Sequence, residues 1–489
     1  MISRLVDSRW TVGAAAAAAL LMRLLGLTRP VRADEAGFTL VARAWQPSPG
    51  SLYGTYFVDK PPPLIALFKL SDAVGGPLFI RLVGALAAAA LVLVAAATAR
   101  RLSDEAAARW TAVAAAALVT TPAIDLVAVK GEVLALPFLL GAVGAALVAV
   151  RDRSGWPAVA SGLLTAIPLG LKQNLAGAVV FTAVLFVGSH LAGRLSRRDL
   201  ARLAGAALAG FAVPVLITLG WAVAAGVRLH TLSYAVYGFR GDASAALGDS
   251  SVAAPARRAA VLLLILVATG VAVVLGAYLA RLRAHLRADA PLTVAVVAMV
   301  AFDVVSLALG GSFWHDYAFG LVPGALVATA LVAARLRARL VPLMAASTVV
   351  CLVGWGAWNL AGQQEFDEHD TGVALRAVAR PGDTLVVFGG RADLQLESGM
   401  PSPYPYLWSL PMRALDPDLT RLRALVDGPD APTWIVAWWS FDTWTDQGEG
   451  LRRDVEQRYV ERGTGCDGRT IWLLRGETRP TPEPDCHGG

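Results

Sequence analysis

Long apolar runs recur from the N-terminus to about residue 361, and they limit what this chain can fold into more than any other feature of its sequence. A helix that crosses a bilayer needs about 20 predominantly apolar residues. Runs dominated by Ala, Val, Leu and Gly predict eleven such spans, near residues 10–27, 78–99, 106–126, 133–150, 156–171, 174–192, 201–226, 258–280, 290–309, 317–334 and 340–361. We therefore expect a mainly α, polytopic membrane protein with about 11 transmembrane helices.

The composition agrees with a membrane location. Of the 489 residues, 56% are hydrophobic and 16% are charged, and the mean hydropathy is +0.56. In a soluble domain roughly a quarter of the residues are charged. Because the chain becomes more polar after residue 361, we expect a transmembrane domain over residues 1–361 and a soluble domain over residues 362–489.

Arginine marks one side of the predicted membrane domain, because short loops rich in Lys and Arg stay in the cytoplasm. Five arginine-bearing loops each follow an even-numbered span: Arg100 and Arg101; Arg151 and Arg153; Arg194, Arg197 and Arg198; Arg281, Arg283 and Arg287; Arg335, Arg337 and Arg339. With Arg4 and Arg9 before the first span, this predicts a plasma-membrane protein with a cytoplasmic N-terminus and an extracytoplasmic C-terminal domain. We expect the first span to be retained, since its cleavage as a signal sequence would break the pattern. The net charge of +6 is then mostly a topology signal, and we expect no nucleic-acid binding.

Side chains capable of chemistry gather in the loops that are predicted to lie outside the cell. The first outer loop spans about residues 28–77. The outer loops carry Asp34, Glu35, Lys60, Lys130, Glu132, Lys172, His315 and Tyr317. The inner loops offer almost nothing except arginine. A reaction site is therefore expected on the extracytoplasmic side.

Asp34 and Glu35 open a predicted helix over residues 33–45. The apolar residues from Phe38 to Trp45 recur at helical spacing, which suits a helix that lies on the outer membrane surface. Carboxylates in the first turn complement the helix dipole. Two interpretations of Asp34 stay open: an N-cap, or a general base that takes a proton from an acceptor hydroxyl.

Lysine is rare in this chain. Of the 43 basic residues only four are lysine, at Lys60, Lys69, Lys130 and Lys172. A compact ammonium group suits a phosphate, although a lysine stem can also simply reach the membrane interface, which fits Lys69 well. Pro61–Pro63 stiffen the segment that follows Lys60. This segment is either a positioning device for a phosphate contact or a helix start.

Charged residues also fall inside the predicted spans. Arg23 lies in the first span, Arg81 in the second and Asp303 in the ninth. Charges within a span are rare and usually face the bundle interior or a wet cavity. We expect the two arginines to be structural or cavity charges, and Asp303 to pair with one of them.

In this order the motifs resemble those of the GT-C membrane glycosyltransferases, in particular the protein O-mannosyltransferase and lipid A aminoarabinose transferase superfamily (families 39 and 83). The resemblance covers about residues 15–335. Its elements are Arg23, the acidic pair Asp34 and Glu35, the segment Phe57, Lys60, Pro61, Pro62 and Leu64, then Arg81, Glu132, Lys172, and His315 with Tyr317 and Pro323. The chain departs from the pattern in its third proline and in its C-terminal segment, which leaves the subfamily open.

The resemblance implies an inverting transfer of a sugar from a polyprenyl-phosphate donor to an extracytoplasmic acceptor. It implies a catalytic group of Asp34 as the base, Glu35 and Glu132. It also implies that the donor phosphate is held by Lys60, Lys172, His315 and Tyr317. The acceptor is left open between a cell-wall glycan, a lipid and a protein hydroxyl, and the donor sugar between mannose, arabinose and others.

Two further questions stay open at the level of sequence. A polytopic transporter or flippase would also have many spans and charges within them, although transporters place their binding groups on broken helices near the midplane. No cofactor is certain and no metal ligand set is assigned, but Asp34, Glu35 and Glu132 could gather a divalent cation.

The C-terminal segment predicts a small α/β domain. Strands are expected at Thr384–Gly390, Thr433–Trp439 and Thr470–Gly476, and helices at Asp416–Val426 and Gln447–Val460. The stretch GMPSPYPYLWSLP between them is expected either to contact the acceptor or to pack on the membrane domain. Cys466 and Cys486 either form a disulfide or stay free, since both lie on the oxidising side.

Overall fold

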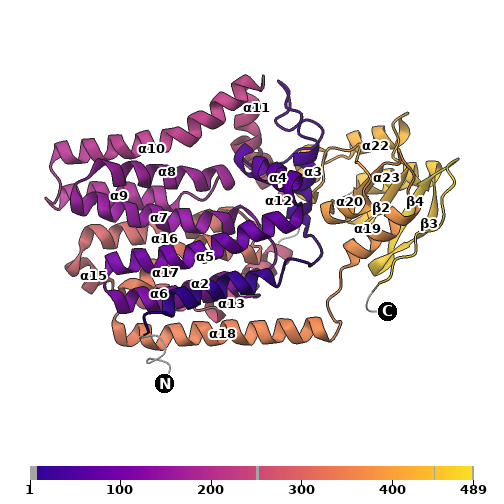
Figure 1. Ribbon diagram of the computed structural model, residues 1–489. Coiled ribbons are helices and arrows are strands. Elements are labelled where there is room, and N and C mark those ends of the chain that lie inside the picture. The colour runs from indigo at the N-terminus through magenta and orange to yellow at the C-terminus, as the bar shows by residue number, and fades with distance from the viewer. Residues whose placement is uncertain (1–7, 249–252, 445, 487–489) are drawn as a thin grey trace.

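The computed structural model describes residues 8–248, 253–444 and 446–486, so Arg4 lies outside the described residues. A bundle of long helices forms one part of the molecule, and a four-stranded sheet with its helices forms the other (Figure 1). The chain is a polytopic, mainly helical membrane protein.

Each of the eleven predicted spans coincides with a helix or a pair of helices. Nine are single helices: α2 (Thr11–Leu24), α5 (Pro77–Leu102), α6 (Glu105–Thr120), α7 (Gly131–Asp152), α8 (Gly155–Leu171), α9 (Gly177–Leu191), α10 (Arg197–Ala224), α16 (Ala290–Leu309) and α18 (Ala334–Leu360). Two are pairs: α13 (Ala253–Ala268) with α14 (Val271–Leu279), and the 3-10 helix η2 (His315–Leu321) with α17 (Val322–Leu331). Within the described ranges, five helices are long and apolar enough to cross a membrane, or six if the bent pair α13 and α14 counts as one span.

The eighth predicted span is not one continuous helix. The axis bends by 72° between α13 and α14. Gly270 lies at the bend with a positive φ of 82°, which L side chains rarely adopt. A Cβ atom at this position would come within 2.5 Å of the Met344 side chain. The apolar run alone did not reveal the break.

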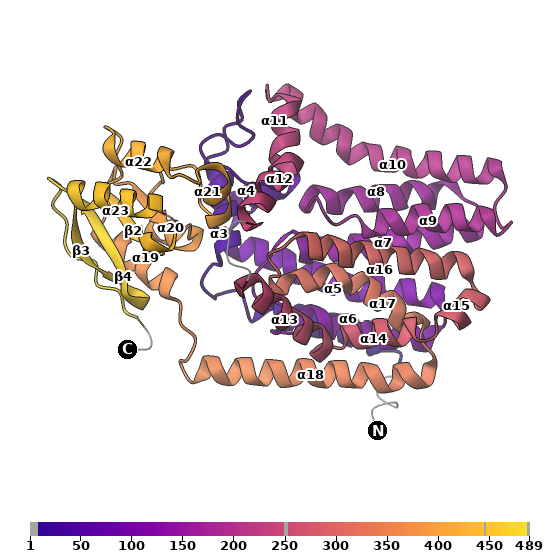
Figure 2. The same ribbon diagram turned by 180° about the vertical axis from the view of Figure 1, so that it is seen from behind.

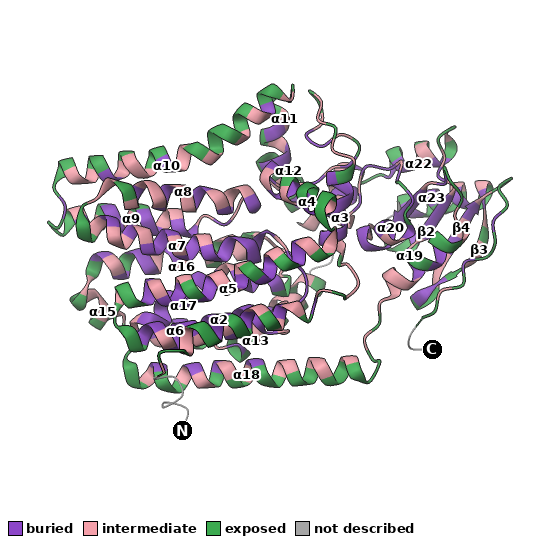
Figure 3. Ribbon diagram, in the orientation of Figure 1, coloured by how far each residue is buried: buried purple, intermediate pink, exposed green. Residues whose placement is uncertain are grey.

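The outer faces of α10 and α18 remain exposed, as Figure 3 shows in green along both helices. The exposed side chains of α10 include large apolar residues, namely Leu208, Val213, Leu216 and Ile217. A contiguous exposed apolar surface of this kind marks a partner or a membrane. In a polytopic membrane protein these faces suit contact with lipid.

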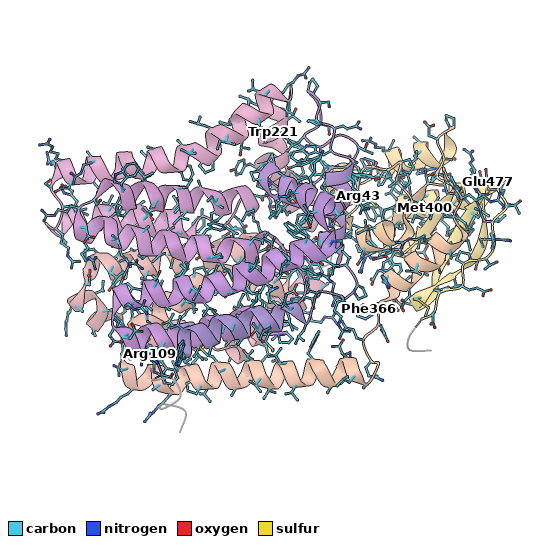
Figure 4. All side chains as sticks on the ribbon, in the orientation of Figure 1. Arg43, Arg109, Trp221, Phe366, Met400 and Glu477 are labelled. Atoms are coloured by element: carbon cyan, nitrogen blue, oxygen red, sulfur yellow. A yellow bond between two sulfur atoms is a disulfide. The ribbon has the colours of Figure 1, made fainter. Side chains whose placement is uncertain are left out.

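Short helices gather at one end of the bundle, next to the sheet (Figures 1 and 2). They are α3 (Ala33–Arg43), α4 (Pro62–Val74), α11 (Leu229–Ser233), the π-helix η1 (Tyr234–Gly238) and α12 (Phe239–Gly248). The short helix α15 (Leu282–Ala288) lies at the opposite end, and Figure 4 shows Arg109 far from Arg43 and Met400. The sequence did not predict any helix for the segment that forms α11, η1 and α12.

The C-terminal sheet has the strand order β1-β2-β4-β3. Its strands are β1 (Leu385–Phe388), β2 (Trp434–Ala437), β3 (Tyr459–Gly465) and β4 (Arg469–Leu474). β1 and β2 are parallel, and the other pairs are antiparallel. The helices are α19 (Asp367–Val378), α20 (Ala392–Ser398), α21 (Ser409–Leu415), α22 (Thr420–Asp427) and α23 (Asp446–Arg458), with short 3-10 turns η3 (Phe441–Thr443) and η4 (Cys466–Gly468).

The three predicted strands and the second predicted helix are confirmed, whereas the first predicted helix begins later than expected. Asp416 does not open α22; instead its carboxylate accepts hydrogen bonds from the backbone N–H groups of Arg421 and Leu422, at 3.0 Å each. Strand β3 and helices α19 to α21 were missed. Cys466 and Cys486 are joined by a disulfide, which decides between the two alternatives left by the sequence, and Cys351 is free.

Candidate functional site

Asp34 lies in the first turn of α3 and is held by groups from two distant parts of the chain. Its Oδ2 is 2.9 Å from Nζ of Lys130, and its Oδ1 accepts a hydrogen bond of 3.0 Å from the indole N–H of Trp408. The Asp34 side chain keeps 35% of its surface exposed. The carboxylate is therefore fixed in direction but still accessible.

The N-cap interpretation of Asp34 is wrong, because the cap is made by its neighbour. The Glu35 carboxylate accepts a 3.3 Å hydrogen bond from the backbone N–H of Arg32, the residue that precedes α3. Glu35 also pairs with Arg81 at 2.8 Å and accepts a 3.0 Å hydrogen bond from the backbone N–H of Val129. Because Glu35 makes the capping hydrogen bond, the Asp34 side chain is not used as a cap and pairs with Lys130 instead.

The buried pair of Glu35 and Arg81 ties three segments together. Both side chains are only 1% exposed. Arg81 also donates to the backbone carbonyls of the segment that leads into α3: Gly26, Leu27, Arg29 and Pro30. Because Asp34 follows this segment and Lys130 follows Val129, the pair of Glu35 and Arg81 sets the position of Asp34 against Lys130.

Arg23 holds the backbone on the Lys130 side of the site in a similar way. It donates to the backbone carbonyl of Val119 near the end of α6 and to those of Asp125, Leu126 and Ala128 on the connection between α6 and α7. The prediction that Asp303 pairs with Arg23 or Arg81 is wrong, because these two arginines are saturated by carbonyls and by Glu35. Among the described residues Asp303 forms no ion pair.

Asp316 on η2 is the second carboxylate of Lys130, at 3.2 Å. It is buried, with 4% of its surface exposed. The neighbouring His315 places its Nδ1 against the carbonyl oxygen of Ile124. Lys130 therefore lies between the carboxylates of Asp34 and Asp316.

Lys60 forms a second charged group beside the first. Its Nζ is 2.5 Å from Oδ1 of Asp59, and both side chains are partly exposed. Arg240 of α12 approaches Oδ2 of the same aspartate at 3.9 Å. The hydroxyl of Tyr53 donates to the Lys60 carbonyl at 2.5 Å. A lysine and an arginine thus share one carboxylate at the start of the proline segment.

Lys172 lies deeper than the other two lysines. It pairs with Glu132, lies 4.3 Å from the ring centroid of Tyr317, and has only 9% of its side chain exposed. These three residues line a small cavity together with Asn174, Leu175, Asp303, Ser306, Leu307 and Gly320. The Lys172 ammonium is therefore enclosed by a carboxylate and an aromatic face.

The local charges keep Asp34 ionised. Burial alone would raise the pKa of Asp34, but the positive charges of Lys130 and Lys60, with the hydrogen bonds from Lys130 and Trp408, lower this pKa to about 2. Burial likewise opposes ionisation of Asp59, and Lys60 and Arg240 outweigh it and lower the pKa of Asp59. Both groups are carboxylates at neutral pH.

Helix α3 is more enclosed than the sequence suggested. Its residues 35–42 are all buried, and the helix packs against α4 on one side and α20 on the other. The expectation that only one apolar face of this helix is buried is therefore wrong. The C-terminal domain covers α3, and this placement brings Trp408 to Asp34 (Figures 1 and 3).

The three acidic candidates do not converge on one point. Asp34 pairs with Lys130, Glu35 with Arg81, and Glu132 with Lys172. Among the described residues, no group of three or more His, Cys, Asp and Glu is arranged to hold a metal ion. The arrangement offers no support for a divalent cation held by Asp34, Glu35 and Glu132.

No family model and no curated protein sequence matches this chain. Its structure is similar to ArnT from Cupriavidus metallidurans in the apo state, with a TM-score of 0.61 and 14% sequence identity over 94% of this chain and 97% of ArnT. The ArnT structure bound to undecaprenyl phosphate gives 0.60 and 14%, covering 95% of this chain and 98% of ArnT. The Archaeoglobus fulgidus oligosaccharyltransferase in complex with Zn and sulfate gives 0.53 and 12%, covering 95% of this chain and 73% of that chain.

The chain has the fold of the GT-C membrane glycosyltransferases. This confirms the fold that the motifs predicted. At such low identities the likeness concerns the fold alone, and it carries neither a substrate nor a residue role to this chain. The roles of the predicted site residues therefore rest on their contacts.

Three residues of this candidate site were missed from the sequence. Asp316 lies between the predicted site residues His315 and Tyr317, so its position was available as a signal. Arg240 was not identified as a site residue because no helix was predicted for the segment that contains it. Trp408 belongs to the aromatic stretch GMPSPYPYLWSLP, and no pattern in the sequence connects it with Asp34.

Proposed function

We propose that this protein is an inverting glycosyltransferase that moves a sugar from a polyprenyl-phosphate donor to a hydroxyl acceptor outside the cell. The observation that carries the proposal is a partly exposed, ionised carboxylate, Asp34, next to a group of cations that includes Lys60 and Lys130, at one end of a GT-C fold. The acceptor is a cell-wall glycan, a glycolipid or a protein hydroxyl.

Asp34 acts as the general base in this proposal. An ionised carboxylate accepts up to about four hydrogen bonds, and the contacts from Lys130 and Trp408 leave room for the hydroxyl of an acceptor. A carboxylate with a pKa near 2 is a weak base. A donor phosphate bound at Lys60 would cancel part of the positive field and raise the pKa of Asp34, so the base strengthens when the donor is in place.

Lys60 and Arg240 are the proposed contacts of the donor phosphate. Both are partly exposed, with 20% and 33% of their side chains open, and they converge on Asp59. A phosphate can take the place of that carboxylate, since it offers the same kind of acceptor with more charge. Lys172 and Tyr317 line the neighbouring cavity and form the deeper wall of the donor site, and His315, held against the Ile124 carbonyl, lies two residues before Tyr317.

The proposed step breaks one bond and forms one. The acceptor oxygen attacks the anomeric carbon from the face opposite the phosphate, and its proton passes to the Asp34 carboxylate. The bond between the anomeric carbon and the phosphate oxygen breaks, and polyprenyl phosphate leaves with its electron pair. Lys60 and Arg240 stabilise the negative charge that develops on this leaving group.

Glu35 and Arg81 serve as the scaffold of the base in this proposal. Their side chains are buried and satisfied by one another and by the backbone. Arg23 serves as the scaffold of the connection that carries Lys130. The proposed N-terminus is cytoplasmic and the proposed C-terminal domain is extracytoplasmic, as the arginine pattern predicts.

The test is a transfer assay with the purified protein reconstituted in vesicles. Radiolabelled polyprenyl-phosphate mannose and arabinose are offered with membrane extracts as the acceptor, and nucleotide-linked forms of the same sugars serve as the control. We expect label in the acceptor fraction only from a lipid-linked donor. Transfer from the nucleotide sugars, or movement of intact donor across the vesicle without transfer, would overturn the proposal.

A further inference from the structure

We propose that Trp408 of the C-terminal domain is a positioning residue for the base, so that this domain is a working part of the site. The inference rests on the proposed function, in which Asp34 takes the acceptor proton. Trp408 precedes α21 and is 374 residues from Asp34 in sequence, yet its indole N–H donates to Oδ1 of Asp34 at 3.0 Å.

The sequence of α3 is adapted to this contact. Gly37 lies one helical turn after Asp34, and a Cβ atom placed on it would be only 2.0 Å from the Trp408 ring. Any other residue at position 37 would expel the indole or force α3 away from it. Phe38 borders the same ring, with the two centroids 5.8 Å apart.

The loop before Trp408, residues 399–408, is fastened to the first loop of the membrane domain at further points. The backbone N–H of Ser402 donates to the hydroxyl of Tyr56 at 3.0 Å. The carbonyl of Pro405 accepts a 3.0 Å hydrogen bond from the backbone N–H of Phe57. Phe57 lies three residues before Lys60, so this one loop touches the segments of both proposed functional groups.

The two contacts of Asp34 use different oxygens of its carboxylate. Lys130 approaches Oδ2 and Trp408 approaches Oδ1. An ion pair alone leaves a carboxylate free to rotate about its terminal bond, which is a soft torsion. The indole N–H removes this freedom and aims the remaining lone pairs. Trp408 touches no reacting atom in this scheme, so it acts through Asp34.

The experiment replaces Trp408 with benzothienylalanine, which keeps the bicyclic ring and puts sulfur in place of the N–H, and in parallel uses Trp408→Phe. Loss of a hydrogen bond to a charged group corresponds to roughly a 10- to 100-fold lower kcat. We expect that loss with an unchanged KM for the lipid donor and an unchanged thermal midpoint for the isostere. A merely structural Trp408 would lower the midpoint and leave kcat alone.

The matched control is Trp444→Phe. The Trp444 indole also donates one hydrogen bond within the C-terminal domain, at 2.8 Å to the carbonyl of Pro417, and it belongs to the core of that domain. We expect this variant to lose stability while kcat stays at the parent value. Equal loss of kcat in both variants would overturn the inference.

Asp34→Asn separates failure of this inference from failure of the proposed function. If Asp34→Asn abolishes transfer while the benzothienylalanine protein keeps the parent kcat, only the positioning role falls. If Asp34→Asn transfers normally, the proposed base falls. The ¹⁵N-labelled indole of Trp408 gives a readout without turnover: its N–H resonance should shift in Asp34→Asn, and an unmoved resonance would contradict the contact.

Discussion

At the scale of single residues, the site is organised by a division of labour between two adjacent acids. Glu35 is buried, caps α3 and pairs with Arg81, while Asp34 keeps 35% of its side chain exposed and meets Lys130. A buried ion pair is strongly destabilising to break, because one charge is left without compensation. The neighbour of the proposed base is thus the less replaceable residue for folding, and the base itself is the more accessible one.

Lys60→Ala should impair use of the donor. Removing the ammonium takes away a phosphate contact, so we expect a KM for the polyprenyl-phosphate donor that is roughly 10-fold higher, in line with a charge-assisted hydrogen bond. Lys69→Ala is the matched control, because Lys69 is an exposed lysine on α4 whose ammonium lies over the Trp45 ring and, among the described residues, pairs with no carboxylate of the site. Equal effects of the two variants would return Lys60 to a role at the membrane interface.

Lys130→Met should change the pH profile of transfer. The parent pKa of Asp34 is lowered from 3.8 to about 2, so the parent carboxylate stays ionised throughout the usable range. Without Lys130, burial raises the pKa of Asp34, and activity is lost as the pH falls through that higher value. We expect the ratio of the rates at about pH 5 and pH 7.5 to fall in the variant and to stay flat in the parent.

The control for this profile is Lys69→Met, which should leave the ratio unchanged. If Lys130→Met shows the same ratio of the two rates as the parent, Lys130 does not control the pKa of Asp34.

The effect of pH on the stability of the fold follows from the lowered pKa of Asp34. A carboxylate with a lowered pKa stabilises the fold above its ordinary pKa, and that stabilisation is lost as the pH falls from 3.8 toward about 2.

At the scale of elements, the bundle depends on close contacts between small residues. Helices α8 and α10 cross at a pair of glycines. A Cβ atom on Gly162 would be 1.8 Å from the carbonyl oxygen of Ala207, and one on Gly210 would be 2.0 Å from that of Val159. Small residues let helix backbones approach closely in membranes. This contact holds α10, which leads into α11 and α12 and therefore to Arg240.

Gly210→Ala should destabilise the bundle. The added methyl group has no space, and overpacking typically costs about 1–3 kcal/mol. Gly205→Ala on the same helix is the control, because no atom lies within 4 Å of its Cβ position and alanine favours a helix over glycine by about 1 kcal/mol. Thermal unfolding in detergent should show a lower midpoint for the first variant and an equal or higher midpoint for the second. The reverse order would contradict the crossing.

Periodicity and apolar runs predicted the long elements well, and the short elements poorly. A run of about 20 apolar residues has few alternatives to a helix in a membrane, so all eleven runs became helices or helix pairs. The break at Gly270 depends on contact with Met344, which is a tertiary effect. Helices such as α20 and α21 have seven residues each, too few for a periodic signal to emerge.

At the scale of the whole molecule, the charged groups of the site lie at the end of the bundle that the C-terminal domain covers (Figures 1 and 2). The arginine pattern and the order of motifs predicted which loops carry these groups. They did not predict that residues 399–408 reach Asp34, because a contact between residues 374 positions apart depends on how the C-terminal part packs against the helix bundle. The resemblance to the GT-C class covered only the membrane part.

Opposite membrane sides are expected for the two ends of the bundle. In a Cys351→Ala background, Gly50→Cys lies in the first loop where no atom is within 4 Å of the Cβ position, and Ser103→Cys lies between α5 and α6 in an exposed position. A membrane-impermeant maleimide added to intact cells should label the first and spare the second until the cells are opened. Labelling of Ser103→Cys but not of Gly50→Cys in intact cells would show that the topology is the opposite of the proposed one.

The most direct measurement of the central claim compares Asp34→Asn with Asp72→Asn in the reconstituted transfer assay. Asp72 lies on α4 at the same end of the bundle and pairs with Arg43 at 2.8 Å, so it controls for the loss of one carboxylate there. We predict that Asp34→Asn lowers kcat by at least about 100-fold, the lower end of what general base catalysis supplies, while Asp72→Asn keeps the parent rate. Undiminished transfer by Asp34→Asn would contradict the account.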